Sequence, residues 1–223
     1  EVGATLGLMR SLLMLLHSPG VTHVAVAFDH VIESFRNTLY AGYKTGEGVD
    51  PILMNQFPLA EQAVSALGVV VWPMVEFEAD DAIAAATARF KKIKSVEQIV
   101  ICSVDKDLTQ MVEDKRIVCW DRRREIILDE KGVVEKFGVK PESIPDYLAL
   151  VGDSADGYPG IQGWGAKSTA TVLAKFKHIE SIPKDPKKLT LGLGRATTLV
   201  ENLQANYQDA LLFRELSTLR KDV

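Results

Sequence analysis

Carboxylate side chains gather at four places in the chain, and each place lies where a strand is expected to end or a helix to begin. The eight residues are Asp29, Glu78, Asp80, Asp81, Asp105, Asp107, Asp153 and Asp156. Oxygen ligands from several elements, with no cysteine or histidine among them, suit Mg²⁺ or Mn²⁺. Eight carboxylates are too many for one Mg²⁺, which keeps several waters, so we expect two ions about 4 Å apart. Such pairs drive in-line hydrolysis of phosphodiesters.

The stretch GDSADGYPGIQGWGAKSTA combines two chemistries. Asp153 and Asp156 stand three residues apart, a spacing that lets both carboxylates converge on one point. Gly163 and Gly165 come directly before an expected helix with Lys167 in its first turn. Glycines there let backbone N–H groups approach an anion, which the helix dipole also favours. The stretch therefore offers cation ligands at one end and a phosphate-binding turn at the other, as a nucleic acid crossing a metal centre would require.

Strands and helices alternate through the first part of the chain, which is typical of an α/β fold. Apolar runs at 21–29, 69–72 and 98–104 indicate buried strands, and acids follow the first and third directly. Sites in open α/β sheets form outside such strand ends. Two shorter strands, 117–120 and 125–128, flank the basic turn 122–124. Helices are expected at 4–17, 59–67, 79–90, 108–112 and 130–137.

The rest of the chain is expected to be helical, with helices at 143–151 and 167–176 and two or more after Pro186. Helix, glycine turn and helix together resemble a helix-hairpin-helix, which binds nucleic-acid backbones without regard to sequence. Trp164 is expected to plug this hairpin as a buried apolar side chain. We place the domain boundary near Lys140, which gives units 1–139 and 140–223.

Between residues 30 and 54 the apolar periodicity fades and basic and aromatic side chains interleave. The residues are Phe35, Arg36, Tyr40, Tyr43 and Lys44. This mixture predicts a mobile, partly exposed segment suited to phosphate contacts and base stacking. A solvated loop with incidental charge is the alternative interpretation.

The net charge of −4 argues at first against a nucleic-acid partner. Outside the eight clustered acids, however, basic side chains outnumber acidic ones, so divalent ions would leave a mildly basic surface. Cys102 and Cys119 lie in apolar runs and are expected to be buried thiols in a reducing compartment. No apolar run reaches membrane-spanning length. We expect a cytoplasmic, nucleoid-associated monomer.

Five motifs appear in the order known from a nuclease family: FDH at Asp29, FRN…YK from Arg36 to Lys44, EADD, DKDL at Asp105, and LVGDSADGYPGIQGWGAKS. With them the chain resembles the bacterial 5′-to-3′ exonuclease and flap-endonuclease family, which includes the nuclease domain of DNA polymerase I. The resemblance implies a PIN-like mixed, mostly parallel sheet flanked by helices, with a C-terminal helical helix-three-turn-helix module. It also implies Mg²⁺-dependent cleavage of DNA at 5′ flaps, nicks and branches.

The resemblance assigns roles residue by residue. Asp29, Glu78 and Asp80 would hold the first metal, whereas Asp105, Asp107, Asp153 and Asp156 would hold or shape the second, with Asp81 near both. Lys44 and Arg36 would steer the scissile phosphate, and with Asp80 and Asp105 they form the implied catalytic set. DNA contacts would come from Arg36, Tyr40, Lys44, Gly163, Gly165, Lys167 and Ser168. A potassium ion would lie against the main-chain carbonyls of Leu150, Val151, Pro159, Ile161 and Trp164.

Two departures from the family pattern matter. The family begins with a strand that ends in a metal-binding aspartate, and this chain starts after that point. The family often carries an arginine shortly after the Tyr-Lys pair, whereas TGEG follows Lys44 here. Two other hypotheses therefore stay open: a DNA-structure binding module with impaired catalysis, and a PIN-type ribonuclease, which would share the acids without needing the helical hairpin.

Overall fold

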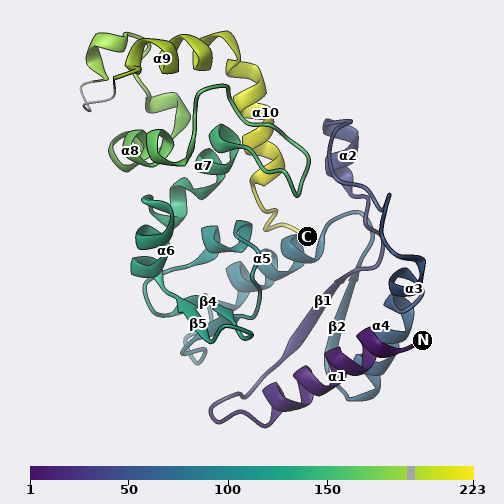
Figure 1. Ribbon diagram of the computed structural model, residues 1–223. Coiled ribbons are helices and arrows are strands. Elements are labelled where there is room, and N and C mark those ends of the chain that lie inside the picture. Colours follow the sequence, from purple (N-terminus) through teal and green to yellow (C-terminus); the bar gives the residue numbers. More distant parts are fainter. Residues whose placement is uncertain (190–193) are drawn as a thin grey trace.

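The computed structural model describes residues 1–189 and 194–223. Its first part is an α/β assembly and its last part a bundle of helices (Figure 1). Among the described residues, no helix is both long and apolar enough to cross a bilayer.

In the described part of the chain, the strands form two separate sheets. β1 (Ala25–Asp29) pairs in parallel with β2 (Val70–Met74), so that Asp29 lies opposite Met74. β3 (Ile99–Ile101) pairs in parallel with β4 (Ile117–Asp121), and β4 pairs antiparallel with β5 (Ile126–Leu128). Within residues 1–189 and 194–223, β1 and β3 each pair along one edge only. The strand pairing is mixed and mostly parallel, as expected. The strands form two sheets rather than one, because β1 and β3 do not pair with each other in the described residues.

Helices α1 (Gly3–Leu16) and α4 (Phe57–Ala66) pack on the first sheet through a small core of Leu12, Val64 and Val69. Helix α5 (Ala79–Phe90) contacts both β1 and β2 and also the 3₁₀ turn η1 (Asp107–Met111). Because α5 touches the first sheet and the element that follows β3, it joins the two halves of the α/β part.

The helical part begins with α6 (Glu130–Phe137), which ends at Gly138 in the left-handed conformation that glycine adopts most easily. The 3₁₀ turn η2 (Pro141–Ser143) leads into α7 (Ile144–Val151). Then follow α8 (Ala166–Phe176), η3 (Ile179–Ser181), η4 (Pro186–Lys188), α9 (Ala196–Ala205) and α10 (Tyr207–Ser217). One hydrophobic core runs from Ile117 in β4 to Leu216 in α10, so it is continuous across the predicted boundary.

Most predicted elements are present, with ends shifted by a few residues. The strand predicted at 21–29 is shorter and only partly buried, because one edge of β1 is unpaired. The helix predicted at 108–112 is a 3₁₀ turn. Trp164 is buried as expected, with its indole N–H donating to the Leu199 carbonyl at 2.9 Å. The expectation of two buried thiols was wrong for Cys102, which is exposed.

The segment 30–54 contains more regular structure than its composition suggested. It contains α2 (Phe35–Leu39) and α3 (Pro51–Met54), and Tyr43 is only 3% exposed. Ser34 caps α2 in a capping box with Asn37, a pattern that the sequence SFRN carries. The segment is partly exposed, as predicted, and its mobility stays a prediction.

Candidate active site

The acids of the first sheet meet at the N-terminus of α5. Asp29 ends β1, and its Oδ1 accepts a hydrogen bond of 2.7 Å from the backbone N–H of Ala79, the first residue of α5. Glu78 and Asp81 form a capping box, since the Asp81 carboxylate accepts from the Glu78 N–H at 3.0 Å. The helix dipole favours negative charge at this end. The hydrogen bonds that begin the helix at EADD therefore also bring Asp29, Glu78 and Asp81 close together.

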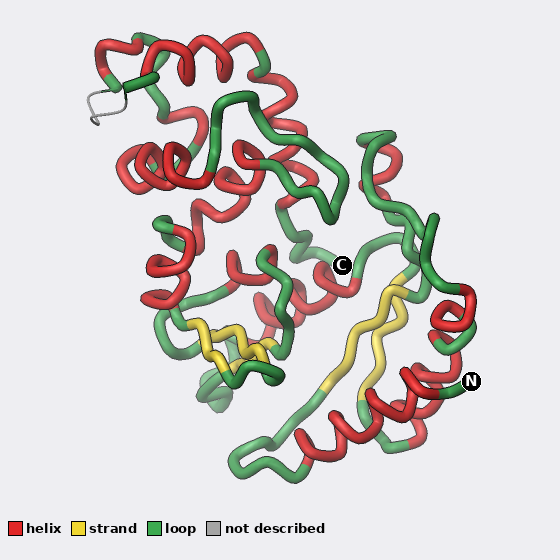
Figure 2. The backbone as a smooth tube through the Cα atoms, in the orientation of Figure 1, coloured by secondary structure: helices red, strands yellow, loops and turns green. Residues whose placement is uncertain are grey.

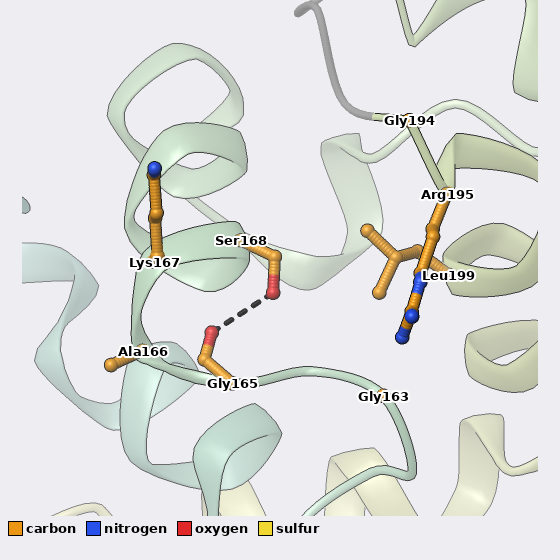
Figure 3. Close-up of a pocket in the computed structure, with 8 residues that line it drawn as sticks. All are labelled: Gly163, Gly165, Ala166, Lys167, Ser168, Gly194, Arg195 and Leu199. Atoms are coloured by element: carbon orange, nitrogen blue, oxygen red, sulfur yellow. Dashed lines mark hydrogen bonds between the residues drawn. The ribbon is translucent and has the colours of Figure 1, made fainter.

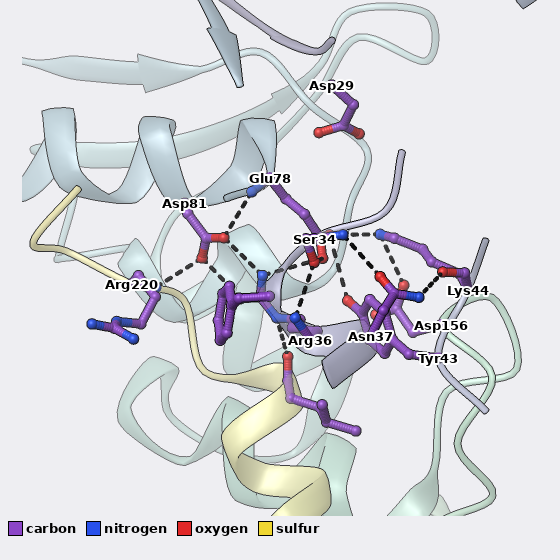
Figure 4. A network of polar contacts seen from close by, with 12 residues as sticks. Asp29, Ser34, Arg36, Asn37, Tyr43, Lys44, Glu78, Asp81, Asp156 and Arg220 are labelled. Atoms are coloured by element: carbon purple, nitrogen blue, oxygen red, sulfur yellow. Dashed lines mark hydrogen bonds and ion pairs between the residues drawn. The ribbon is translucent and has the colours of Figure 1, made fainter. Parts of the chain in front are cut away.

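Arg36, Glu78 and Asp81 form a buried group that we name the Arg36 cluster (Figure 4). The guanidinium binds Asp81 through two bonds of 2.7 and 2.8 Å and reaches Glu78 Oε1 at 3.2 Å. Ser34 donates to the same Glu78 oxygen at 2.7 Å. Burial disfavours both carboxylate charges, but it is outweighed by Arg36 acting with other partners, which are Lys44 and Ser34 at Glu78 and two backbone N–H groups at Asp81. These partners together hold the pKa of each carboxyl below its ordinary value.

Lys44 links this cluster to the acids of the second half of the chain. Its Nζ lies 2.8 Å from Glu78 Oε2 and 3.1 Å from Asp156 Oδ1. Its backbone N–H donates to the Asp156 carbonyl at 3.0 Å, which fixes the two loops against each other. Gly157 permits this approach, because a Cβ there would lie 2.1 Å from the Gly42 carbonyl oxygen. Lys44 is half-buried, and its ammonium faces carboxylates from both parts of the site.

Asp107, Asp153 and Asp156 form a second group, the Asp107 cluster, in which one carboxylate oxygen of each lies within 4.8 Å of the others. All three are buried. Lys106 is ion-paired with Asp153, and Lys44 is paired with Asp156. Asp107 Oδ1 is buried without a hydrogen-bond partner among the described residues. Burial, followed by the charges of Asp105 and Asp156, raises the pKa of Asp107 well above its ordinary value.

Asp105 acts electrostatically on both Asp80 and Asp107. Burial, and then the charge of Asp105, raises the pKa of Asp80 to about 8. Asp105 is exposed and accepts the backbone N–H of Asp107 at 2.9 Å. Burial also raises the pKa of Asp29 and of Asp156. The predicted acids therefore converge, since their charges act on one another across elements far apart in the sequence.

The chemistry of this donor set fits divalent cations. The available groups are all carboxylate oxygens, and Asp107 presents a buried oxygen that lacks a partner. Buried carboxylates with raised pKa values repel one another until a positive charge lies between them. Asp29, Asp80, Asp105, Asp107, Asp153 and Asp156 are the residues that could hold such ions.

The structure changes the roles of two predicted residues. Arg36 is 1% exposed, so it contacts carboxylates and backbone rather than a phosphate. Asp81 is fully buried, and each of its oxygens accepts two hydrogen bonds, which leaves none for a metal. These two assignments are corrected because both side chains are used inside the fold. Tyr40 is half-buried and forms a T-shaped pair with Phe213, with 5.7 Å between ring centroids, and its contact with DNA stays a prediction.

In the glycine hairpin between α7 and α8, the backbone around Gly152 packs directly against the backbone around Gly160. A Cβ on Gly152 would lie 2.5 Å from the Pro159 carbonyl, and one on Gly160 would lie 2.4 Å from the Gly152 nitrogen. Of the five carbonyls predicted to bind potassium, that of Leu150 accepts the Ile161 N–H and that of Ile161 accepts the Trp164 N–H. The other three are Val151, Pro159 and Trp164. The potassium site stays a prediction.

The hairpin opens into a hollow of about 450 Å³ at the N-terminus of α8 (Figure 3). Gly163, Gly165, Lys167 and Ser168 line it, as does Arg195 from the start of α9. The first turn of α8 contains no acidic residue, and Gly165 provides no side-chain cap. The four predicted phosphate contacts therefore lie together, with a second cation beside them.

Sequence reasoning missed three contributors to these sites: Ser34, Lys106 and Arg195. Lys106 stands between Asp105 and Asp107, and a lysine flanked by two acids could have been predicted as their counter-charge. The other two carry no local pattern that points to the site, because their partners lie in distant elements.

Two family models match the chain. The model described as the 5′-3′ exonuclease N-terminal resolvase-like domain matches residues 1–138, and the 5′-3′ exonuclease C-terminal SAM fold matches residues 139–223. A 5′-3′ exonuclease of Aquifex aeolicus is 34% identical over 215 residues, which cover 96% of this chain and 72% of that protein. The thermostable DNA polymerase I of Thermus thermophilus is 31% identical over 223 residues, but the match spans only 26% of the polymerase.

A solved structure of similar fold is the flap endonuclease of bacteriophage T5 in a pseudo-enzyme-product complex with DNA and metal ions. It superposes with a TM-score of 0.75 over 93% of this chain and 78% of that one, at 18% identity. The likeness shows a shared fold, in which a resolvase-like α/β part precedes a helical part.

Proposed function

Because this chain belongs to the 5′-3′ exonuclease family, we propose that it hydrolyses phosphodiester bonds in DNA carrying 5′ flaps, nicks or branches. The observation that supports this most directly is the convergence of acids from β1, α5, η1 and the hairpin loop on one region. The glycine hairpin, a turn suited to phosphate, lies in the same chain and is joined to that region by the loop that carries Asp153 and Asp156.

Two Mg²⁺ or Mn²⁺ ions, when bound, would supply a nucleophile at neutral pH and neutralise charge on the leaving oxygen. Asp107, Asp153 and Asp156 would hold one ion, and Asp29 and Asp80 the other, with Asp105 between them. Glu78 would act mainly through its ion pairs with Arg36 and Lys44.

Lys44 is the cation best placed to meet the scissile phosphate. Its ammonium is half-buried between Glu78 and Asp156, at the junction of the two acidic groups. Positive charge held there would stabilise the negative charge that develops on the phosphate in the transition state. The backbone N–H groups of the α8 N-terminus, with Lys167 and Ser168, would bind a phosphate of the duplex backbone at a point distant from the scissile bond. A potassium ion at the hairpin carbonyls would bridge the protein to that duplex phosphate.

The test is cleavage of a labelled 5′-flap DNA by the full chain in Mg²⁺ or Mn²⁺, with binding to the same substrate measured in parallel. We expect release of the flap oligonucleotide, and its loss in Asp105→Ala. Binding without turnover, even in high Mn²⁺, would instead support a DNA-structure binding module. Preferential cleavage of an RNA flap would support a ribonuclease. Undiminished cleavage by Asp105→Ala would disprove the assigned site.

A further inference from the structure

The end of α10 and the residues after it turn back from the helical part and finish beside α5 (Figure 2). Leu216 and Leu219 are 1% and 5% exposed, whereas Thr218 and Arg220 are exposed to solvent. Gln110 in η1 fixes this segment at two points, since its Nε2 donates to the Ser217 carbonyl at 2.9 Å and its Oε1 accepts the Leu219 N–H at 3.1 Å. Residues 216–220 are therefore held against the α/β part by their backbone, with two leucine side chains buried.

Arg36 joins this segment to the acids of α5. Its Nε donates to the Leu216 carbonyl at 2.7 Å, and one terminal nitrogen donates to the Thr218 carbonyl at 3.2 Å. The backbone N–H of Arg220 donates to Asp81 Oδ1 at 2.8 Å, on the same carboxylate that Arg36 binds. The segment and the start of α5 thus share a single buried charge pair.

The number of donors matches the number of acceptors. A guanidinium has five N–H groups in a fixed plane. Arg36 makes five hydrogen bonds: two to Asp81, one to Glu78 and two to the carbonyls of the C-terminal segment. A lysine could not make this set, because its ammonium has three donors and no planar fork. If residues 216–220 moved, two donors of a buried cation would lose their acceptors.

From these contacts we infer that residues 216–220 are a structural part of the metal-binding site and that Arg36 is the positioning residue that couples them to it. Arg36 fixes the side chains of Glu78 and Asp81, and these two residues fix the first turn of α5, where Asp80 lies. By holding Glu78, Arg36 also fixes the carboxylate that Lys44 binds. The inference rests on the proposed function and deepens it, because it makes the metal affinity of the α/β part depend on the end of the helical part.

The experiment measures Mn²⁺ binding to the full-length chain by the electron paramagnetic resonance of free Mn²⁺, together with thermal unfolding. Arg36→Lys keeps the charge and loses the fork, while Arg220→Pro removes the N–H that Asp81 accepts together with the Arg220 side chain. Arg220→Ala removes the same side chain but keeps that N–H, so it is the matched control. Arg214→Gln is the second control, because Arg214 also ties α10 to a buried carboxylate, that of Asp146, away from the site.

We expect Arg36→Lys and Arg220→Pro to weaken Mn²⁺ binding by about 10- to 100-fold, the usual cost of losing a group that orients metal ligands. Both controls should bind Mn²⁺ as the unmodified chain does, even where Arg214→Gln lowers the melting temperature. Should Arg36→Lys fail to fold, the Arg220→Pro and Arg220→Ala pair decides alone. Unchanged Mn²⁺ affinity in Arg220→Pro would overturn the inference while leaving the nuclease intact. An unmodified chain that neither binds Mn²⁺ nor cleaves DNA would overturn the proposed function itself.

Discussion

The Arg36 cluster and the Asp107 cluster contain the same kind of side chain, at similar burial, in opposite electrostatic conditions. In the first, Asp81 has every oxygen satisfied by Arg36 and two backbone N–H groups. In the second, Asp107 has an oxygen without a partner among the described residues and a pKa raised well above normal. Carboxylates alone do not make a metal site: a buried acid that is already neutralised stabilises the fold, and one that is not is available to a cation.

The same substitution in the two clusters should therefore have opposite effects on stability. Asp81→Asn removes the main counter-charge of a buried arginine, and we expect it to lower the free energy of unfolding by about 3–5 kcal/mol. Asp107→Asn removes charge repulsion, and we expect the free energy of unfolding to stay the same or to rise. Urea unfolding without divalent metal measures both. If Asp107→Asn proved the more destabilising of the two, the contrast between the clusters would be wrong.

For cleavage activity, we expect the substitution in the Asp107 cluster to have the larger effect, although it has the smaller effect on stability. Asp107→Asn removes a candidate metal ligand, and we expect flap cleavage to fall by at least about 100-fold, the upper cost of losing a group that merely orients a ligand. The fold should stay intact in that variant. Single-turnover cleavage in saturating Mg²⁺ is the measurement, and circular dichroism spectra of each protein are the control. Full activity in Asp107→Asn would remove this residue from the site.

The pH dependence of stability should also separate Asp80 from the acids of the Arg36 cluster. Asp80 has a pKa of about 8 in the folded chain against an ordinary 3.8, so the folded state holds an extra proton between these values. Its contribution therefore favours folding at low pH and is lost as pH rises through about 8. The lowered pKa values of Glu78 and Asp81 act in the opposite direction, so their stabilisation is present above their ordinary values and disappears in acid.

Without divalent metal, we expect the melting temperature to decline from pH 5 to pH 9. Each kcal/mol lost corresponds to about 2–4 °C in a chain of this size. Asp80→Asn should flatten the decline, because the side chain it introduces does not ionise. A melting temperature that rises steadily over this pH range would contradict the raised pKa of Asp80.

Much of the site could be predicted from the order of residues. Asp29 follows an apolar run, Asp105 follows another, and the carboxyl ends of strands in such folds face a common region. The acids of EADD begin a helix because the positive end of the helix dipole favours acids there, and the glycines of the hairpin allow backbone contacts that no Cβ would permit. The family models confirm the resemblance that these motifs carried.

The sequence could not show which of several identical carboxylates are neutralised inside the fold and which are available to a metal. Arg36 has its carbonyl partners 180 and 182 residues away, and Asp81 is bound by a backbone N–H 139 residues away. No local pattern marks such contacts, so Arg36 was expected to meet a phosphate and Asp81 a metal. The order of residues determined which chemistry the chain carries, because types and spacings fix strands, helix starts and turns. Only the tertiary structure decided which acids were neutralised, because neutralisation depends on charges brought together from opposite ends of the chain.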